Sequence, residues 1–472
     1  MIFDKLLIDG EWVDGVRTFP VTDKFTGQEV ARVAEISREQ LREAVARAAD
    51  AFRRGPPSPY ARYEILMRAA DAVRARRAEF RDTIVAESGF TVTDAEGEVA
   101  RAVQTLATSA EEAKRLAGEV VPLSGAPIQG TRIGFTLRVP LGVVCAITPF
   151  NSPLNTVAHK LGPALAAGNA VVLKPARATP LTAALLCEVL RGAGVPRGFL
   201  SLVHGPGSKM GDWLLEESAF RSYLFTGSTE VGKSLQRGAG LRRLQLELGS
   251  IASTIVCADA DLDAALPKIL GASFRKAGQV CTSIQLLHVE ESIAEPFTAR
   301  FVAEARKLRA GDPRLGETAV GPMISVAEAE RVERWVAEAA AQGAAVAVGG
   351  PRDGAVLPPT VLTGVRPGMK VVDQEIFGPV VSIVPFARLD DAIDRVNASP
   401  FGLATGIFTR NLDRAFHAAQ ALEVGSVHVN ETSSSRVDLM PYTGTKDSGS
   451  GVEGPKYAIR ELTEERLVTF RI

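Results

Sequence analysis

The stretch from residue 141 to residue 257 decides the fold class. It holds five short apolar runs, separated by segments long enough for a helix: LGVVCAIT (141–148), AVVLK (170–174), FLSLV (199–203), SYLFT (222–226) and STIVC (253–257). Strands that alternate with helices over short connections form a parallel sheet covered by helices. We therefore predict a doubly wound α/β domain whose ligands bind beyond the carboxyl ends of its strands.

The segments before and within this stretch carry helix signals. Ser37, followed by Gln40 three residues later, predicts a helix N-terminus. A second helix is expected over about 60–89, where Gly89 is a suitable C-terminal residue. Thr179-Pro180 is expected to open a further helix, with Thr179 as its N-cap.

After about residue 260 a second alternation appears. Strand-like runs such as IQLLHV (284–289), VVSIVPF (380–386) and GSVHVN (425–430) alternate with helical segments and indicate a second α/β domain. The final run, ERLVTFRI, predicts a strand that completes another sheet, which could belong to another subunit.

Length and composition limit the possible functions. A chain of 472 residues is long enough for two or three domains. Lys plus Arg total 54 and Asp plus Glu total 55, which argues against a nucleic-acid binder or a basic membrane-surface protein. The opening MIFDKLLIDGEW does not resemble a signal peptide, and no apolar run approaches the length of a membrane span, so we expect a cytoplasmic protein. Four cysteines do not form a disulfide scaffold.

Two glycine turns point to a phosphate-binding site. The motif GxGxxG is absent, but Gly205-x-Gly207-x-x-x-Gly211 and FTGSTEVG (225–232) each follow a predicted strand and open a predicted helix. Backbone N–H groups at such junctions bind phosphate. Each turn alone is equally compatible with a structural role, whereas both in one domain predict a dinucleotide site.

Cys281 and Glu247 are the candidate catalytic residues. Cys281 lies in AGQVCTS among small polar neighbours, whereas the other three cysteines lie in apolar runs. A nucleophile and a spare core thiol fit this pattern equally well, since none of the five histidines stands in an obvious pairing motif. Glu247 ends a strand-like run, where a carboxylate is either solvated or an active-site base.

Eight motifs together resemble the aldehyde dehydrogenase superfamily over almost the whole chain. In order they are TPFNSPLN (148–155), LGPALAAGNAVVLKPA (161–176), FTGSTEVG (225–232), LELGS (246–250), GQVCTS (278–283), GDP (311–313), EIFGPV (375–380) and PYTGTKDSG (441–449). The resemblance implies a Rossmann-like cofactor domain (1–118 and 139–246), an α/β catalytic domain (247–440) and a small β bridging or oligomerisation element (119–138 and 441–472). It also implies a homodimer or homotetramer.

The resemblance assigns catalytic roles that make chemical sense. Cys281 matches the nucleophile that forms a thiohemiacetal and then a thioester. The Asn151 side chain and the backbone N–H of Cys281 match the oxyanion donors, and Glu247 matches the base that activates water. Lys160 and Glu464 match a proton-relay pair, and a structural ion pair is the alternative.

The resemblance also implies NAD or NADP as cofactor and no metal. The implied cofactor residues are Thr148, Pro149, Phe150, Lys174, Arg177, Gly207, Gly227, Ser228, Gly249, Glu375 and Phe377. Arg177 stands where members that prefer NAD commonly have a glutamate. Because an arginine attracts a 2′-phosphate, Arg177 predicts that NADP is accepted; the alternative is a solvent-exposed arginine without a role.

The implied substrate channel is polar. It comprises Arg101, Ser152, Asn155, His159, Ser435, Arg436 and Tyr442. Two arginines suit a small polar or anionic aldehyde, such as one that bears a phosphate or phosphonate, although Val280 replaces an arginine that phosphonate-specific members carry. The alternative is that Arg101 and Arg436 form ion pairs with Glu98 and Asp438.

Two other functions remain open. Members that transfer the acyl group to coenzyme A generally lack the base glutamate, so Glu247 favours hydrolysis. A non-catalytic protein of the same fold is disfavoured because Cys281, Glu247 and Asn151 are all present.

Overall fold

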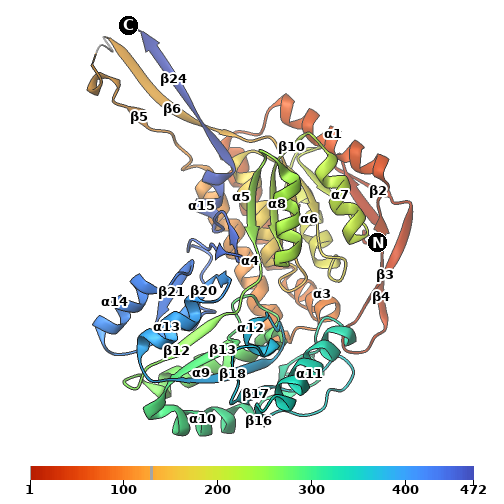
Figure 1. The fold of residues 1–472 in the computed structure, drawn as a ribbon. Helices are drawn as coiled ribbons and strands as arrows, with labels where there is room; N and C mark the ends of the chain where they lie inside the picture. Colours follow the sequence, from red (N-terminus) through yellow and green to blue (C-terminus); the bar gives the residue numbers. More distant parts are fainter. Residues whose placement is uncertain (1, 128–130, 472) are drawn as a thin grey trace.

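The structure is a computed structural model that describes residues 2–127 and 131–471 (Figure 1). Its largest sheet has eight strands in the order β2-β1-β9-β8-β7-β10-β11-β23, of which β9, β8, β7, β10 and β11 run parallel. The strand bounds are Glu11–Asp14 (β2), Lys5–Ile8 (β1), Leu200–Leu202 (β9), Ala170–Lys174 (β8), Val143–Ile147 (β7), Phe220–Thr226 (β10), Arg243–Glu247 (β11) and Gly449–Ser450 (β23). The predicted doubly wound domain is therefore present.

Alternate side chains of the central strands enter two hydrophobic cores. Val144 and Ala146 of β7 pack with one layer of helices, and Val143 and Cys145 pack with the opposite layer. The first layer contains α2 (Pro59–Ala75), α3 (Arg77–Ser88), α4 (Val92–Ala113), α5 (Asn155–Ala167) and α6 (Leu181–Gly192), and the second contains α1 (Arg38–Arg54) and α7 (Gly207–Glu216). Helix α8 (Thr229–Ala239) packs beside β10 and β11.

Helix boundaries confirm some sequence signals and correct others. Ser37 and Gln40 form the predicted capping box of α1. The helix expected over 60–89 is two helices, because Arg76 leaves the helical conformation (φ −94°, ψ 20°) between α2 and α3. Its guanidinium forms ion pairs with Glu79 and Glu188, an arrangement that the sequence does not indicate.

The N-terminus of α6 also differs from the prediction. Thr179 does not cap this helix, and α6 begins at Leu181 after Pro180. Instead, the buried Glu87 carboxylate accepts hydrogen bonds from the backbone N–H groups of Leu181 (2.7 Å) and Thr182 (2.9 Å). A local sequence pattern cannot predict a helix cap that comes from a residue 94 positions away.

A second sheet of seven strands has the order β16-β17-β18-β13-β12-β20-β21 and is parallel except for β16. The bounds are Ala345–Val348, Thr360–Thr363, Val380–Phe386, Leu286–Glu290, Ser253–Val256, Ala404–Phe408 and Ser426–Val429, in sheet order. The run STIVC thus forms β12 of this sheet rather than of the first, where β11 takes its place. An apolar run does not reveal which of two neighbouring sheets it joins.

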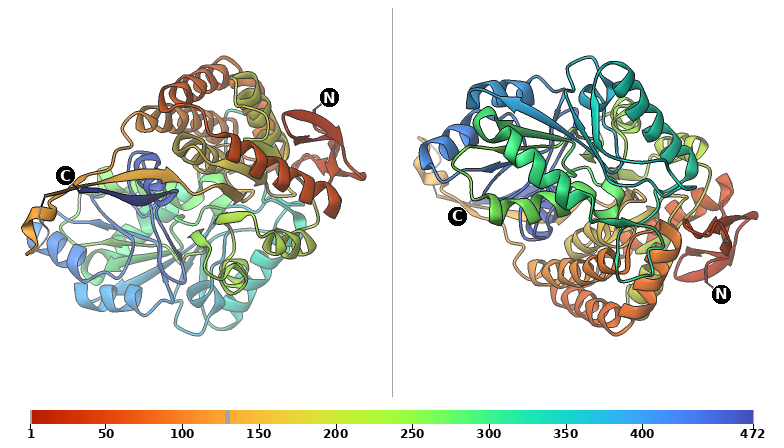
Figure 2. Two further views of the ribbon diagram at one scale, coloured as in Figure 1. Left: turned by 90° about the horizontal axis from the view of Figure 1, so that it is seen from above. Right: turned by 90° about the horizontal axis from the view of Figure 1, so that it is seen from below.

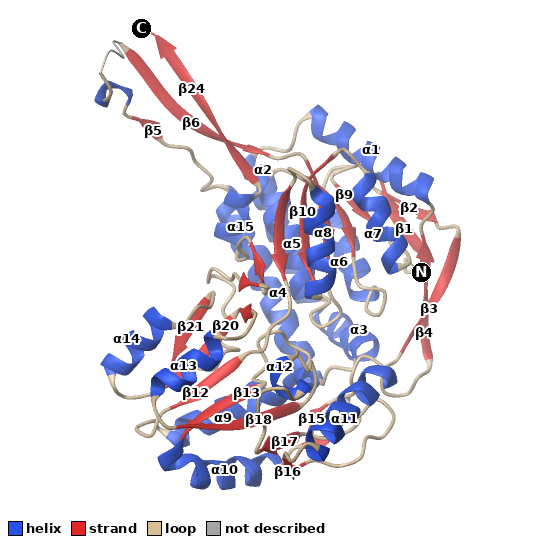
Figure 3. Cartoon of the chain, viewed as in Figure 1, coloured by secondary structure: helices blue, strands red, loops and turns tan. Residues whose placement is uncertain are grey.

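Helices cover both faces of the second sheet (Figure 3). One hydrophobic core packs the strands against α9 (Leu262–Phe274), α10 (Glu291–Ala305) and α11 (Val326–Ala341), and a second packs them against α13 (Leu389–Asn397) and α14 (Leu412–Ala421). The remaining short elements are β3 (Arg17–Thr22), β4 (Glu29–Glu35), η1 (Leu123–Gly125), η2 (Arg275–Gly278), β14 (Arg309–Ala310), β15 (Thr318–Val320), α12 (Lys370–Asp373), β19 (Phe401–Gly402) and β22 (Thr445–Lys446).

A three-stranded antiparallel arm projects from the body and lies opposite the N-terminal strands (Figures 1 and 2). It consists of β24 (Thr463–Arg471), β6 (Arg132–Pro140) and β5 (Val120–Val121). Residues 128–130 of the predicted element lie outside the described residues. From 441–472 only β24 joins the arm, because β23 belongs to the first sheet and α15 (Pro455–Glu461) packs on α4 and α5.

No helix in the described ranges is long and apolar enough to cross a membrane.

Candidate active site

A cavity of about 530 Å³ lies between the two large sheets, at the carboxyl ends of the first. Asn151 and Cys281 line it together with all eleven predicted cofactor residues: Thr148, Pro149, Phe150, Lys174, Arg177, Gly207, Gly227, Ser228, Gly249, Glu375 and Phe377. The parallel strands place the loops after β7, β8 and β10 at one edge, which is why residues far apart in sequence meet here.

The part of the cavity beside the first sheet offers unsatisfied polar groups. Helix α8 begins after Ser228, whose side chain makes no capping hydrogen bond, so the N–H groups of its first turn remain available to a phosphate. The hydroxyls of Thr148 and Thr226 are buried without a partner in the described part of the chain. The amine of Lys174, whose pKa burial lowers, likewise has no hydrogen-bond or ion-pair partner among the described residues. These groups fit the hydroxyls and phosphates of a dinucleotide.

Arg177 stands at the rim of this cavity. Its guanidinium stacks on the Phe19 ring at 3.8 Å and lies 3.5 Å from the Glu35 carboxylate. Glu35 also accepts a hydrogen bond from Arg17 at 2.7 Å. The Arg177 side chain remains 45% exposed, so the ion pair leaves part of its guanidinium open to a ligand.

Glu375 and Phe377 lie at the opposite end of the cavity, near the thiol. A Glu375 carboxylate oxygen accepts a hydrogen bond from the Ser250 N–H at 2.8 Å, and burial raises the pKa of Glu375 to about 7. A Cβ atom at Gly249 would lie 2.7 Å from the other Glu375 oxygen, so a larger residue there would displace this carboxylate. Phe377 takes a left-handed conformation (φ 46°) and meets the Phe150 ring edge-on at 5.9 Å. Arg331 also lines the cavity, and sequence reasoning missed it.

Cys281 lies in the loop between η2 and β13, with its sulfur 3.1 Å from the Tyr442 hydroxyl oxygen. Burial raises the pKa of the Cys281 thiol to about 11, and the Glu375 and Glu247 carboxylates contribute to this rise. The Tyr442 hydrogen bond and the Arg436 charge oppose it. In this state the thiol is protonated at neutral pH.

Hydrogen bonds connect the Asn151 loop to the Cys281 loop. The Asn151 side-chain N–H donates to the Gln279 carbonyl at 2.9 Å. The Lys276 ammonium donates to the Glu98 carboxylate at 2.5 Å and to the Asn151 carbonyl at 3.0 Å. The other Glu98 oxygen accepts from the backbone N–H of Leu154 at 2.9 Å. A buried ion pair thus connects the Asn151 loop to the segment that leads to the Cys281 thiol.

The backbone before Cys281 adopts an uncommon conformation. Lys276 (φ 52°) and Ala277 (φ 53°) are left-handed without being glycines, which costs on the order of 1–3 kcal/mol each. At Gly278 an added Cβ would lie 2.0 Å from the Gly378 carbonyl oxygen, so only glycine fits. The contacts of Lys276 offset the cost of its conformation.

Glu247 ends β11 and is 3% exposed. Both carboxylate oxygens are buried and have no hydrogen-bond partner in the described ranges. Burial raises the pKa of Glu247 well above its usual range, and the neighbouring Glu453 carboxylate raises it further. A carboxyl group in this environment is a strong base once it is ionised.

Comparison with known proteins agrees with this geometry. The sequence model of the aldehyde dehydrogenase family matches residues 12–468. The chain belongs to the aldehyde dehydrogenase family. This membership confirms the expected fold class and the assignment as an aldehyde dehydrogenase that uses NAD or NADP.

Among the relatives of this dehydrogenase is the 3-sulfolactaldehyde dehydrogenase of Priestia aryabhattai, which is 48% identical over 467 residues (99% of this chain and 98% of the relative). The lactaldehyde dehydrogenase of Methanocaldococcus jannaschii is 35% identical over 98% of this chain and 99% of its own length. Among solved structures, the NADP-dependent glyceraldehyde-3-phosphate dehydrogenase of Bacillus halodurans C-125, complexed with NADP, has a TM-score of 0.97 at 33% identity and covers 100% of both chains.

The partner of Lys160 in this dehydrogenase differs from the prediction. The Lys160 ammonium lies 2.6 Å from the Glu453 carboxylate, and both groups are buried. Glu464 lies on the exposed strand β24, 3.9 Å from Arg243, because the chain has left the body for the arm at that point. Glu453 follows the glycine-rich segment SGSGV, which is the only signal that could have singled it out.

Three of the predicted substrate residues contact one buried carboxylate, that of Asp438. Asp438 accepts hydrogen bonds from Arg101 at 2.8 Å and Asn155 at 3.3 Å, and lies 2.8 Å from His159. Burial alone would raise the pKa of Asp438, but the contacts with His159 and Arg101 hold it well below its usual range. The alternative that Arg101 is paired with Asp438 thus describes the structure.

Arg436 is paired as well, although with a different carboxylate from those expected. It donates to Glu453 at 2.9 Å and stacks on the Tyr442 ring at 3.8 Å. Ser152 and Ser435 lie next to Asn151 and Arg436 in the two loops that carry them.

Arg275, which sequence reasoning missed, is the arginine near the thiol without a carboxylate partner. In the part of the chain that the structure describes it forms no ion pair, and its buried Nε has no hydrogen-bond partner. It donates to the Ser434 hydroxyl at 3.0 Å, which in turn bonds Thr282, the residue after Cys281. Burial lowers the pKa of Arg275, whereas the Asp94 carboxylate raises it and the Arg101 charge lowers it further.

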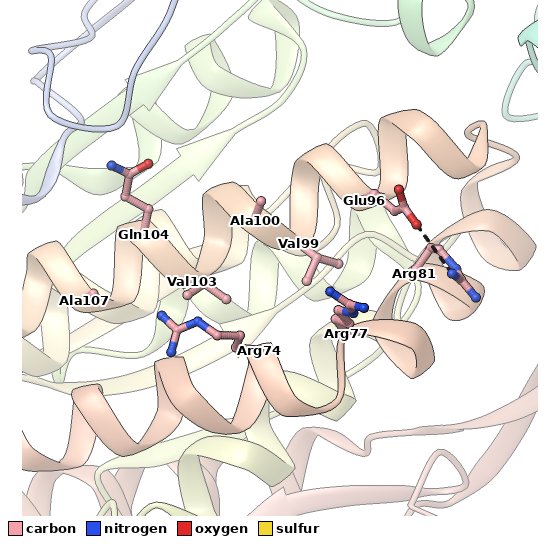
Figure 4. A pocket seen from close by; sticks show the side chains of 9 residues that line it. All are labelled: Arg74, Arg77, Arg81, Glu96, Val99, Ala100, Val103, Gln104 and Ala107. Carbon is pink, nitrogen blue, oxygen red and sulfur yellow. Dashed lines mark hydrogen bonds and ion pairs between the residues drawn. The ribbon is translucent and has the colours of Figure 1, made fainter.

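A second cavity, of about 770 Å³, lies between α2–α3 and α4 (Figure 4). Arg74, Arg77 and Arg81 line it together with apolar residues of α4 such as Val99 and Val103. Arg81 forms an ion pair with Glu96 in this groove. None of the predicted site residues lines it, so we leave it outside the candidate active site.

Proposed function

We propose that this dehydrogenase oxidises a small aldehyde bearing a negatively charged group, with NADP accepted as cofactor. The observation that carries the substrate class is Arg275. The Arg275 guanidinium is buried, forms no ion pair among the described residues and leaves its Nε without a partner there, so an anionic substrate group would supply a charged hydrogen-bond acceptor. The names of the relatives fit this class, since sulfolactaldehyde and glyceraldehyde 3-phosphate are both small anionic aldehydes.

The side chains of the site support a covalent route. The Cys281 thiolate attacks the aldehyde carbon, and the Asn151 side chain and the Cys281 N–H receive the oxyanion, each such donor contributing roughly 3–4 kcal/mol. A nicotinamide held near Glu375 and Phe377 would supply the hydride acceptor that oxidation of the thiohemiacetal to a thioester requires. Glu247 then takes a proton from water, which attacks the thioester and releases the carboxylate.

The substrate class is tested with Arg275→Met. The loss of a charged hydrogen bond of about 1.5–3 kcal/mol lowers kcat/KM roughly 10- to 100-fold. We expect this fall for a three-carbon aldehyde with a sulfonate or phosphate group, and little change for its neutral analogue. An equal fall for both aldehydes, or no fall, would reject Arg275 as the anion-binding residue.

The cofactor preference rests on Arg177, whose partly exposed guanidinium faces the cavity. We expect Arg177→Glu to lower kcat/KM for NADP at least tenfold relative to NAD, because a carboxylate repels the 2′-phosphate. An unchanged ratio of the two kcat/KM values would show that Arg177 does not determine the cofactor preference.

Coenzyme A as acyl acceptor is the second candidate reaction. The buried Glu247 carboxylate, which has no hydrogen-bond partner among the described residues, favours water as the acceptor, so adding coenzyme A should leave the rate unchanged and yield no thioester. Formation of an acyl-coenzyme A product would favour the alternative.

We also propose that the arm joins a second copy of this chain. Ile133 and Phe470 are register partners on the arm and are 50% and 55% exposed, and Leu137 on the same face of β6 is 45% exposed. β24 is an edge strand, whose free N–H and C=O groups favour pairing with another chain.

A further inference from the structure

Tyr442 is the polar side chain in direct contact with the nucleophile. Its hydroxyl oxygen lies 3.1 Å from the Cys281 sulfur, and the residue is 8% exposed. The backbone of Tyr442 exchanges two hydrogen bonds with that of Glu453, at 3.1 and 2.7 Å. The hydroxyl is therefore held at the thiol by main-chain contacts as well as by packing.

The chemistry of the pair decides which atom donates. A thiolate has no proton to give, so a hydrogen bond to it must come from the tyrosine. Burial raises the pKa of Tyr442 well above its usual range, which keeps the hydroxyl protonated at the pH where the thiolate acts. Tyr442 is thus a hydrogen-bond donor in the reactive state rather than a base.

Three buried charged side chains lie in a row behind the Tyr442 hydroxyl. The Arg436 guanidinium lies over the Tyr442 ring at 3.8 Å and polarises it, which makes the hydroxyl a better donor. The Glu453 carboxylate holds Arg436 at 2.9 Å and Lys160 at 2.6 Å. Burial alone would raise the pKa of Glu453, but the charges of Lys160 and Arg436 hold it well below its usual range. The Glu453 carboxylate is therefore ionised.

We propose that Tyr442 is a catalytic residue whose hydroxyl stabilises the Cys281 thiolate, an inference that rests on the proposed role of Cys281 as nucleophile. In the attack the sulfur–carbon bond forms from the thiolate electron pair, and the carbonyl π pair moves to oxygen. In hydrolysis water adds to the thioester, Glu247 takes one of its protons, and the carbon–sulfur bond breaks. The electron pair of that bond returns to sulfur and regenerates the thiolate, which again accepts a hydrogen bond from the Tyr442 hydroxyl. One side chain therefore assists both the nucleophile and the leaving group.

Several charged groups act on the same thiol, from four different segments of the chain: Glu247, Arg275, Glu375 and Arg436. The two carboxylates raise the pKa of Cys281, whereas Arg436 and the Tyr442 hydrogen bond lower it. Tyr442→Phe removes one hydroxyl and leaves these charges in place, so it isolates the hydrogen bond.

The test is the pH dependence of Cys281 alkylation by iodoacetamide in the full-length enzyme without aldehyde, read by mass spectrometry. Cys145, Cys187 and Cys257 are buried, so labelling reports Cys281. In Tyr442→Phe we expect the midpoint of the profile to move up by about one pH unit, the labelling rate near pH 8 to fall about tenfold and kcat to fall as well. Tyr457→Phe, which removes a hydroxyl from α15, is the matched control and should label like the wild type.

An alkylation profile in Tyr442→Phe that coincides with the wild-type profile would overturn the inference. Tyr442→Met, of similar volume and without a hydroxyl, repeats the test if the phenylalanine variant does not fold. Cys281→Ala separates the two proposals. If it still oxidises aldehyde, the proposed nucleophile is wrong; if it is inactive while Tyr442→Phe labels normally, only the role of Tyr442 is wrong.

Discussion

At the scale of single residues, burial works against the chemistry that Cys281 and Glu247 are proposed to perform. Burial raises the pKa of both groups, so each is harder to deprotonate than its free counterpart. The gain is reactivity, because a thiolate or carboxylate that is costly to form is a stronger nucleophile or base. In the proposed mechanism the Tyr442 hydroxyl reduces this cost for the thiolate, and the Asn151 amide stabilises the oxyanion that follows.

The raised pKa values predict the pH dependence of turnover. Activity requires both groups in their deprotonated forms, and a raised pKa moves deprotonation to higher pH. We therefore expect kcat to rise with pH from 6 and to be still rising above pH 8. Steady-state rates across that range check this expectation, and a plateau already reached at pH 6 would show that neither group is perturbed.

At the scale of elements, the site depends on contacts between segments that are distant in sequence. The loop before α5 carries Asn151, and η2 precedes Cys281. The Lys276–Glu98 ion pair connects the two loops through α4. Glu98 is 3% exposed, so Lys276 is its main compensation for burial.

Lys276→Met should therefore be strongly destabilising. It leaves a buried carboxylate without its cation, a change that costs about 3–5 kcal/mol. The free energy of unfolding from urea titration measures this cost. Adding Glu98→Gln removes the orphaned charge and should restore part of the loss, whereas a double variant less stable than Lys276→Met would mean that the pair is not coupled.

At the scale of the whole molecule, the sequence predicts the strand–helix alternation well because buried parallel strands have a strong apolar signature. The eleven predicted cofactor residues meet in one cavity because the parallel strands bring the loops at their carboxyl ends together. Contacts between side chains that are distant in sequence cannot be predicted in this way. Glu453 in place of Glu464, the Glu87 cap of α6 and the unpaired Arg275 all depend on which side chains meet after folding. The division into domains stays a prediction.

The arm leads to a prediction about assembly. Ile133→Lys with Phe470→Glu places charges on its exposed apolar face without touching the cavity. We expect light scattering after gel filtration to show an oligomer for the wild type and monomers for the double variant. If both proteins have the same mass, this face of the arm does not hold subunits together.

The covalent acyl-enzyme is the central claim, and the most direct measurement uses Glu247→Gln. This variant keeps Cys281 but lacks the base, so deacylation should slow roughly 10²–10⁴-fold. When it is mixed with NADP and a small anionic aldehyde, we predict a burst of reduced cofactor close to one per site. Intact-mass spectrometry should then find one acyl group on Cys281, and Cys281→Ala should show neither burst nor adduct. Aldehyde oxidation by Cys281→Ala, or turnover of Glu247→Gln at the wild-type rate without an adduct, would contradict the mechanism.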